Sequence, residues 1–207
     1  MTFLRDRDPF AYADTFCRKW KDKINLIHVN SALLSCSNTY LAQILDICAL
    51  NDLGHDDTFD RTLPTIVLAH HNYAELAFTQ RKALKPILAD LNVRAYLNGD
   101  CHQCSEDNIL LDGGRAIPCF TAPSIYKAQG DDTASIGFYL YEMDTGSPQW
   151  RVNVESYRWI EWQWEIAPCR AIPAFNMRDI RVGLHERYAR DVEKLSLKIL
   201  PEIIYQS

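Results

Sequence analysis

Residues 63–103, LPTIVLAHHNYAELAFTQRKALKPILADLNVRAYLNGDCHQ, hold the most regular pattern in the chain. A β-branched apolar run from Leu63 to Ala69 is followed by apolar positions at helical spacing over Phe78 to Leu91, and a second apolar run covers Val93 to Leu97. This order predicts a β-α-β unit with two parallel strands. The residues that follow each strand should therefore meet at one edge of the sheet, where ligands of open α/β sheets usually bind.

Strands are also expected before and after this unit. The Gly-Asp, Thr-Gly and Ser-Pro pairs late in the chain are turn signals, so the later strands should pair antiparallel. The expected strands are Ile24 to Val29, Ala116 to Phe120, Ser135 to Met143 and Arg151 to Ile166. In the last of them, apolar residues alternate with polar ones, which predicts that its tryptophans belong to the core. The alternating apolar residues are Ile160, Trp162, Trp164 and Ile166.

Helical spacing of apolar residues occurs in three further segments. It is present over residues 10–22, over residues 39–53 up to a C-cap at Gly54, and over residues 177–200 with a single apolar stripe. We therefore expect one continuous domain over residues 1–168 and a C-terminal helical extension over residues 169–207.

Composition narrows the class of protein. The chain has 207 residues, 47% of them hydrophobic, with 22 Lys and Arg against 27 Asp and Glu, a net charge of −5. There is no basic field to attract nucleic acid or an anionic membrane surface. Seven cysteines form no regular framework, so reduced thiols are expected. No apolar run approaches the ~20 residues of a membrane span, and charges interrupt the N-terminus, so we expect a cytoplasmic protein.

Polar side chains follow both strands of the β-α-β unit. His70-His71-Asn72 come directly after the first strand, and Asn98-Gly99-Asp100-Cys101-His102 come after the second. Imidazole and carboxylate groups are ligands for divalent metals, and the paired strand ends should bring them together. The sequence therefore predicts a metal or anion site at this edge.

The same motifs resemble a known family. LAHHNYAEL at 68–76 and NVRAYLNGDCHQ at 92–103 are similar to the last two metal motifs of the calcineurin-like metallophosphoesterases, and INLIHVNSALLS at 24–35 resembles a preceding strand. The resemblance covers roughly residues 10–165. It implies an α/β fold that is part of a four-layer α/β/β/α sandwich, with two divalent ions (Mn, Fe or Zn) in a complete site.

The resemblance also implies roles for single residues. His70 and His102 match catalytic, metal-binding histidines, and Asp100 stands as a metal ligand where the family has the first histidine of Gly-His-x-His. The implied reaction is attack on phosphorus by a hydroxide held between two metals, with a small phosphoester or a phosphoprotein as substrate. The residues expected to support these ligands are His71, Asn72, Asn98 and Gly99.

The family's earlier metal motifs have no counterpart upstream of residue 60. The chain therefore resembles the C-terminal half of the domain, and we expect it to be weakly active or inactive unless a homodimer or a missing N-terminal half completes the site. Two alternatives stay open. One is a degenerate, non-catalytic binding or scaffold module with the same fold. The other is a structural zinc site at Cys101, His102 and Cys104, with Cys119 or His70 as a further ligand.

Overall fold

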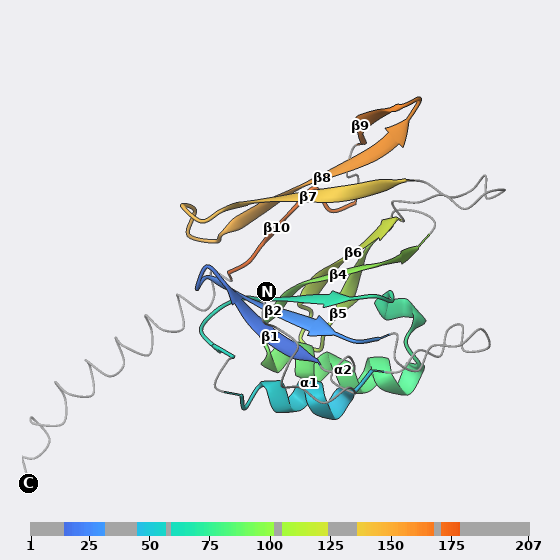
Figure 1. Cartoon of the computed structure of the whole chain (residues 1–207). Helices are drawn as coiled ribbons and strands as arrows, with labels where there is room; N and C mark the ends of the chain where they lie inside the picture. The colour runs from blue at the N-terminus through green and yellow to red at the C-terminus, as the bar shows by residue number, and fades with distance from the viewer. Residues whose placement is uncertain are drawn as a thin grey trace, which may run out of the picture.

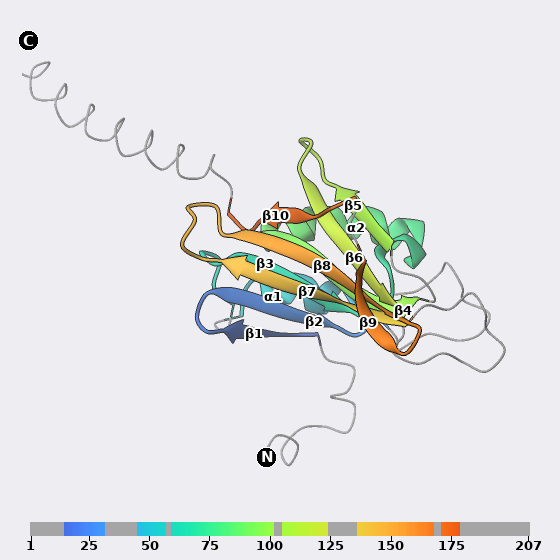
Figure 2. The same ribbon diagram turned by 90° about the horizontal axis from the view of Figure 1, so that it is seen from above.

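The computed structural model describes residues 15–31, 45–56, 59–101, 105–123, 136–167 and 171–178. They form an α/β architecture in three layers. Two helices cover one face of a six-stranded sheet, and a four-stranded sheet covers its other face (Figure 1). Seen from above, the smaller sheet lies across the larger one (Figure 2). The expected α/β class is confirmed at this level.

The larger sheet is mostly parallel. Its strands are β1 (Phe16–Trp20), β2 (Ile24–Val29), β3 (Thr65–Ala69), β4 (Val93–Cys101), β5 (Ser105–Leu110) and β6 (Ala116–Pro123). They follow the order β1-β2-β3-β4-β6-β5. The four central strands run parallel, and the edge strands β1 and β5 are antiparallel to their neighbours. The carboxyl ends of β2, β3, β4 and β6 therefore share one edge.

The predicted β-α-β unit is confirmed. Its helix is α2 (Phe78–Asp90), which connects the parallel strands β3 and β4, and a second helix, α1 (Ile47–Leu53), lies beside it. Both helices bury leucines against the sheet, including Leu50 and Leu88, which pack with Val67 and Tyr96. A 3₁₀ turn at Tyr73–Glu75 links β3 to α2.

The smaller sheet consists of β7 (Gly137–Asp144), β8 (Arg151–Ile160), β9 (Gln163–Ala167) and β10 (Ala174–Asn176), all paired antiparallel as expected. Because side chains alternate along a strand, the larger sheet presents one set of residues to the helices and another set to this sheet. Phe120 of β6 is fully buried between the sheets, with its ring 5.4 Å from that of Tyr141 and 5.7 Å from that of Phe175. Both faces of the central strands are covered, which explains their nearly continuous apolar sequences.

One expected helix is wrong in the part that the structure describes. Residues 10–22 have apolar residues near helical spacing, but Phe16–Trp20 forms strand β1, paired antiparallel with β2. The two strands are joined by residues 21–23. The N–H of Lys23 donates to the carbonyl of Trp20 over 3.0 Å, which closes a turn whose central residues, Lys21 and Asp22, have φ of 49° and 51°. Left-handed residues at both central positions suit the twist of a hairpin, and the usual Asn-Gly signal is absent here.

The predicted burial of the tryptophans is also wrong. Residues 151–166 do not form one strand, because Glu161 and Trp162 make a left-handed turn between β8 and β9. Trp162 is 89% exposed, and Ile160, Trp164 and Ile166 are exposed as well. Trp164 instead meets the ring of Trp159 edge to face, with the two centroids 5.1 Å apart.

Other expected segments are described only in part. Of the helix expected over residues 39–53, Ile47–Leu53 is described and is helical, ending at Gly54 as expected. Residues 168–170 and 179–207, which include the proposed domain boundary and most of the C-terminal helical extension expected over residues 169–207, lie outside the described residues. Within the described part of that segment, Ala174–Asn176 is not helical but forms β10, paired with β8. None of the helices in the described ranges has the length and hydropathy that crossing a bilayer requires.

Phe120 and Trp162 should differ sharply in their contribution to stability. Phe120→Ala leaves a cavity between the two sheets, so we expect the free energy of unfolding to fall by about 3–5 kcal/mol. Trp162→Ala removes an exposed ring at a turn, and its effect should stay within about 0.5 kcal/mol. Urea unfolding followed by circular dichroism measures both. Equal losses in the two variants would contradict the assignment of the core to the space between the sheets.

Candidate active site at the carboxyl edge of the sheet

Polar residues from four parallel strands gather at the carboxyl edge of the larger sheet. Ser31 follows β2, the segment His70–Asn72 follows β3, Asn98 and Gly99 lie in β4, and Thr121 lies in β6. Of these, Ser31, His71, Asn98 and Thr121 are buried. Parallel pairing places all of them at the same end of the sheet, as the sequence predicted for its two motifs.

A backbone hydrogen bond joins the two predicted motifs directly. The N–H of Gly99 donates to the carbonyl of His70 over 3.1 Å. Asp100 is the next residue along β4, so its backbone directly follows this contact. The side chains of Asp100 and Cys101 and the whole of residues 102–104, including His102, lie outside the described part of the chain. Of the three predicted metal ligands, only the side chain of His70 is described.

Strand β4 is irregular where it carries this motif. Against β6, Asn98 is opposite Thr121 and Cys101 is opposite Pro123, so three steps along β4 match two steps along β6. One extra residue therefore lies in β4 between Asn98 and Cys101, a register shift of the kind that β-bulges produce, which are frequent beside active sites.

Ser31 fixes the first motif from the neighbouring strand. Its hydroxyl oxygen accepts hydrogen bonds from the backbone N–H of His70 (3.2 Å) and of His71 (2.9 Å), and it lies 3.0 Å from Nδ1 of the His71 ring. With both lone pairs accepting, its O–H is left to donate to Nδ1, which favours the His71 tautomer with the proton on Nε2. His71 also accepts a hydrogen bond at its backbone carbonyl from the buried Tyr96 hydroxyl over 3.2 Å.

A second chain of hydrogen bonds crosses three strands. Asn72 donates through Nδ2 to the Thr121 hydroxyl over 2.6 Å, and that hydroxyl donates to Oδ1 of Asn98 over 3.1 Å. The other ends of both amides bond locally, since Asn72 accepts from the N–H of Ala74 and Asn98 donates to the carbonyl of Gly99. Both asparagines therefore hold the backbone of the edge in place.

His70 differs from its neighbour. Its side chain is exposed at the end of β3, whereas His71 is 4% exposed, and the two rings meet edge to face with centroids 4.7 Å apart. Because the Nδ1 atom of His71 faces Ser31, the imidazole with access to a ligand at this edge is that of His70. The geometry thus separates one histidine that can reach a metal from one that packs behind it.

The metal-binding capacity of the described residues is limited. Among the side chains that the structure describes, no three His, Cys, Asp or Glu groups lie close enough to hold an ion. A metal site that includes His70 would therefore need ligands from outside the described side chains, and the assignment of Asp100 and His102 stays a prediction. Imidazole and carboxylate donors together suit Mn, Fe or Zn.

Cys119, a ligand in the alternative zinc site, is buried in β6. Its thiol lies 3.6 Å from Oδ1 of Asn98, and burial raises its pKa from 9.0 to about 12. A zinc ligand must be a thiolate, and before a metal binds, burial keeps this thiol protonated, so zinc itself would have to drive its ionisation. Cys101, His102 and Cys104, the other members of that site, have no described side chains.

Sequence reasoning missed Ser31 and Thr121. Both are short hydroxyl residues to which the sequence assigned no role, although Ser31 lies within the segment 24–35 that resembles a strand of the family, and their contacts to His71 and Asn72 span 40 and 49 positions. Only the pairing of β2 with β3 and of β4 with β6 brings them to this edge.

Comparison with known proteins adds little to this picture. No protein-family model and no curated protein sequence matches the chain. Solved structures that resemble it include one titled GAP50, the anchor in the inner membrane complex of Plasmodium, at 14% sequence identity and a TM-score of 0.45. The match covers 79% of this chain and 53% of that one, so this chain spans about half the length of that structure. A likeness at this level establishes no shared family.

Loss of the Ser31 hydroxyl should destabilise the edge. Ser31→Ala removes the acceptor of two backbone N–H groups in a buried environment, so we expect the free energy of unfolding to fall by about 1–3 kcal/mol. Ser105→Ala, at an exposed position, is the matched control and should change it by less than about 0.5 kcal/mol. Urea titration gives both values. An unchanged midpoint in Ser31→Ala would contradict the hydrogen bonds assigned to this hydroxyl.

Cys119 should resist alkylation in the folded protein. Raising its pKa from 9.0 to about 12 leaves about a thousandfold fewer thiolates at pH 8, and the thiolate is the reactive form. We expect iodoacetamide to label the exposed Cys48 quickly, while Cys119 reacts only after unfolding in urea. Peptide mapping by mass spectrometry distinguishes the two sites. Equal rates in the folded state would show that Cys119 is accessible and ionised.

Proposed function

We propose that the chain is a phosphoester hydrolase of the calcineurin-like metallophosphoesterase type, with its site at the carboxyl edge of β3 and β4. The observation that carries this proposal is the hydrogen bond between Gly99 and His70, because it sets the His70 segment beside the strand that leads to Asp100 and His102. The layers of helices, parallel sheet and second sheet are also compatible with the fold that the sequence resemblance implies.

In this proposal His70, Asp100 and His102 hold divalent metal. The ions, when bound, supply Lewis-acid stabilisation of the charge on the phosphoryl oxygens. The chain's own residues set the geometry. Ser31 holds the backbone at His70 and His71, and the Asn72–Thr121–Asn98 hydrogen bonds fix the ends of β3, β4 and β6 relative to one another. Preorganised supports of this kind keep metal ligands in position.

The proposed site is incomplete within this chain. Three ligands are few for two ions, so we propose that a second copy of the chain, or an N-terminal half of the domain, supplies the others. The four-layer α/β/β/α sandwich belongs to the same proposal. The described residues supply three layers, and the exposed face of the smaller sheet, with Trp159, Trp164 and Ile166, is where a fourth layer would pack.

Hydrolysis of an aryl phosphodiester tests the proposal. With Mn²⁺ added, the chain should release nitrophenol from bis-nitrophenyl phosphate, and His70→Ala, Asp100→Asn and His102→Ala should each lower the rate by at least about a hundredfold. His55→Ala is the control, because His55 is exposed beyond the end of α1 and away from the carboxyl edge. A rate unaffected by the three substitutions would contradict the assignment of the site.

A non-catalytic module is the second candidate, and one observation favours it. The side-chain amides of Asn72 and Asn98 form hydrogen bonds within the fold, so fewer polar groups at the carboxyl edge can bind a substrate. Mn²⁺ binding measured by electron paramagnetic resonance separates the two candidates. Binding that depends on His70 and His102 without turnover would indicate the module, and absence of binding would contradict a metal site altogether.

A further inference from the structure

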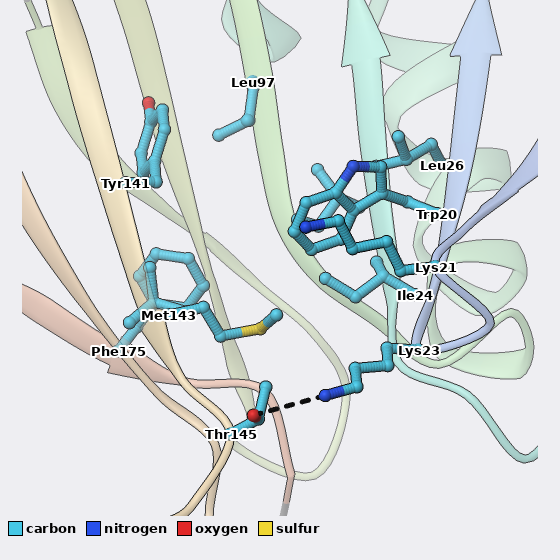
Figure 3. Close-up of a pocket in the computed structure, with 12 residues that line it drawn as sticks. Trp20, Lys21, Lys23, Ile24, Leu26, Leu97, Tyr141, Met143, Thr145 and Phe175 are labelled. Atoms are coloured by element: carbon cyan, nitrogen blue, oxygen red, sulfur yellow. Dashed lines mark hydrogen bonds between the residues drawn. The ribbon is translucent and has the colours of Figure 1, made fainter.

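A cavity lies between the two sheets, beside the first residues of β2 and β3, and it extends along β4 as far as Leu97, the residue before Asn98. It has a volume of about 410 Å³ and is bordered by the β1–β2 turn, the beginning of β3 and the inner faces of β7 and β10. In Figure 3, Tyr141, Met143 and Phe175 line one side, and Ile24 and Leu26 line the other. This volume falls within the range of small-molecule sites, about 300–1,000 Å³.

The walls of this cavity are apolar side chains at the border of the packed core between the sheets. Leu26, Ile66 and Leu97 face the smaller sheet, yet they remain partly exposed, as do Tyr141 and Met143 on the opposite wall. Elsewhere between the sheets, Phe120 and Met177 are fully buried. Protein interiors are normally packed as densely as organic crystals, so a gap of this size between two apolar faces is suited to an apolar guest.

The mouth of the cavity carries positive charge. Lys21 and Lys23, from the β1–β2 turn, are among its lining residues, and none of the described lining residues is acidic. Lys23 donates a hydrogen bond to the Thr145 hydroxyl across the opening over 3.4 Å, as Figure 3 shows. An ammonium group has three donors, so this contact leaves others for a ligand. Lys21 lies over the Trp20 ring at 4.8 Å.

The turn that presents these lysines holds Lys21 in a left-handed conformation, with φ of 49°. Glycine and asparagine adopt that conformation more readily than lysine does. Lysine at this position lowers the stability of the folded protein relative to glycine or asparagine. This cost agrees with a role for the Lys21 ammonium group at the cavity mouth.

We propose that this cavity binds an amphipathic anion, a medium-chain alkyl carboxylate, with its tail between the sheets and its carboxylate at Lys21 and Lys23. The apolar walls match the tail, and the two ammonium groups match the head. The site uses other residues than the proposed metal site, and it stands or fails independently of phosphoester hydrolysis.

Calorimetric titration with decanoate tests the match of charge and tail together. Decanoate should bind at a single site, while acetate, which has the head alone, should give no heat of binding. Decyltrimethylammonium has a tail of the same length and the opposite charge, and it should bind at least about tenfold more weakly. Equal affinity for the two long-chain ions would overturn the proposed role of the lysines, and no binding of decanoate would overturn the site.

Substitutions locate the binding. The double variant Lys21→Asn, Lys23→Gln removes both charges, and asparagine suits the left-handed position, so we expect decanoate to bind about tenfold more weakly. Met143→Trp fills the cavity and should abolish binding, with Ile66→Phe as a second filling variant if the first unfolds the protein. Lys82→Asn, on the exposed side of α2, is the control. Unchanged affinity in a folded filling variant would place decanoate elsewhere and overturn the proposal.

Discussion

The parallel pairing of β3 with β4 is the interaction on which the fold and both candidate sites depend. It aligns Ala69 with Asn98. Along each of the two strands, side chains alternate between the face covered by α1 and α2 and the face covered by the smaller sheet. A slip of one residue would reverse these faces along the whole strand. Because both faces are buried, this register is strongly specified, and the position of His70 beside Gly99 follows from it.

The sequence predicted the secondary structure correctly where local periodicity and tertiary packing agree. Over residues 63–97, β-branched runs flank a helical pattern, and the observed β3, α2 and β4 match it closely. Sequence patterns failed to predict two hairpins, whose turns are Lys21-Asp22 and Glu161-Trp162. Both turns need left-handed residues, and neither contains the glycine or asparagine that normally marks them, so β1 was assigned to a helix and β8–β9 to one strand.

The candidate site was predictable in outline for a different reason. Histidines after one strand and an aspartate after the next are visible in the sequence, because a β-α-β unit fixes where such residues meet. Their supports are not visible. Ser31 and Thr121 each contribute a single hydroxyl from a distant segment. The register shift between Asn98 and Cys101 becomes visible only when β4 is paired with β6. These features depend on tertiary pairing, which local patterns do not encode.

The two candidate sites lie apart along β3 but come close together along β4, where Leu97 lines the cavity and the next residue, Asn98, belongs to the carboxyl edge. Four steps along β3 lie between Ile66 at the cavity and His70 at the carboxyl edge, about 13 Å at ~3.3 Å per residue. Exposed charges so far apart are screened at physiological ionic strength, where the Debye length is about 8 Å. The lysines at the cavity mouth therefore contribute little to the electrostatics around His70, and a ligand in the cavity would influence the carboxyl edge through β4, by contact with Leu97 beside Asn98. Close packing of α1 and α2 against β2, β3 and β4 opposes a shift of the strands themselves.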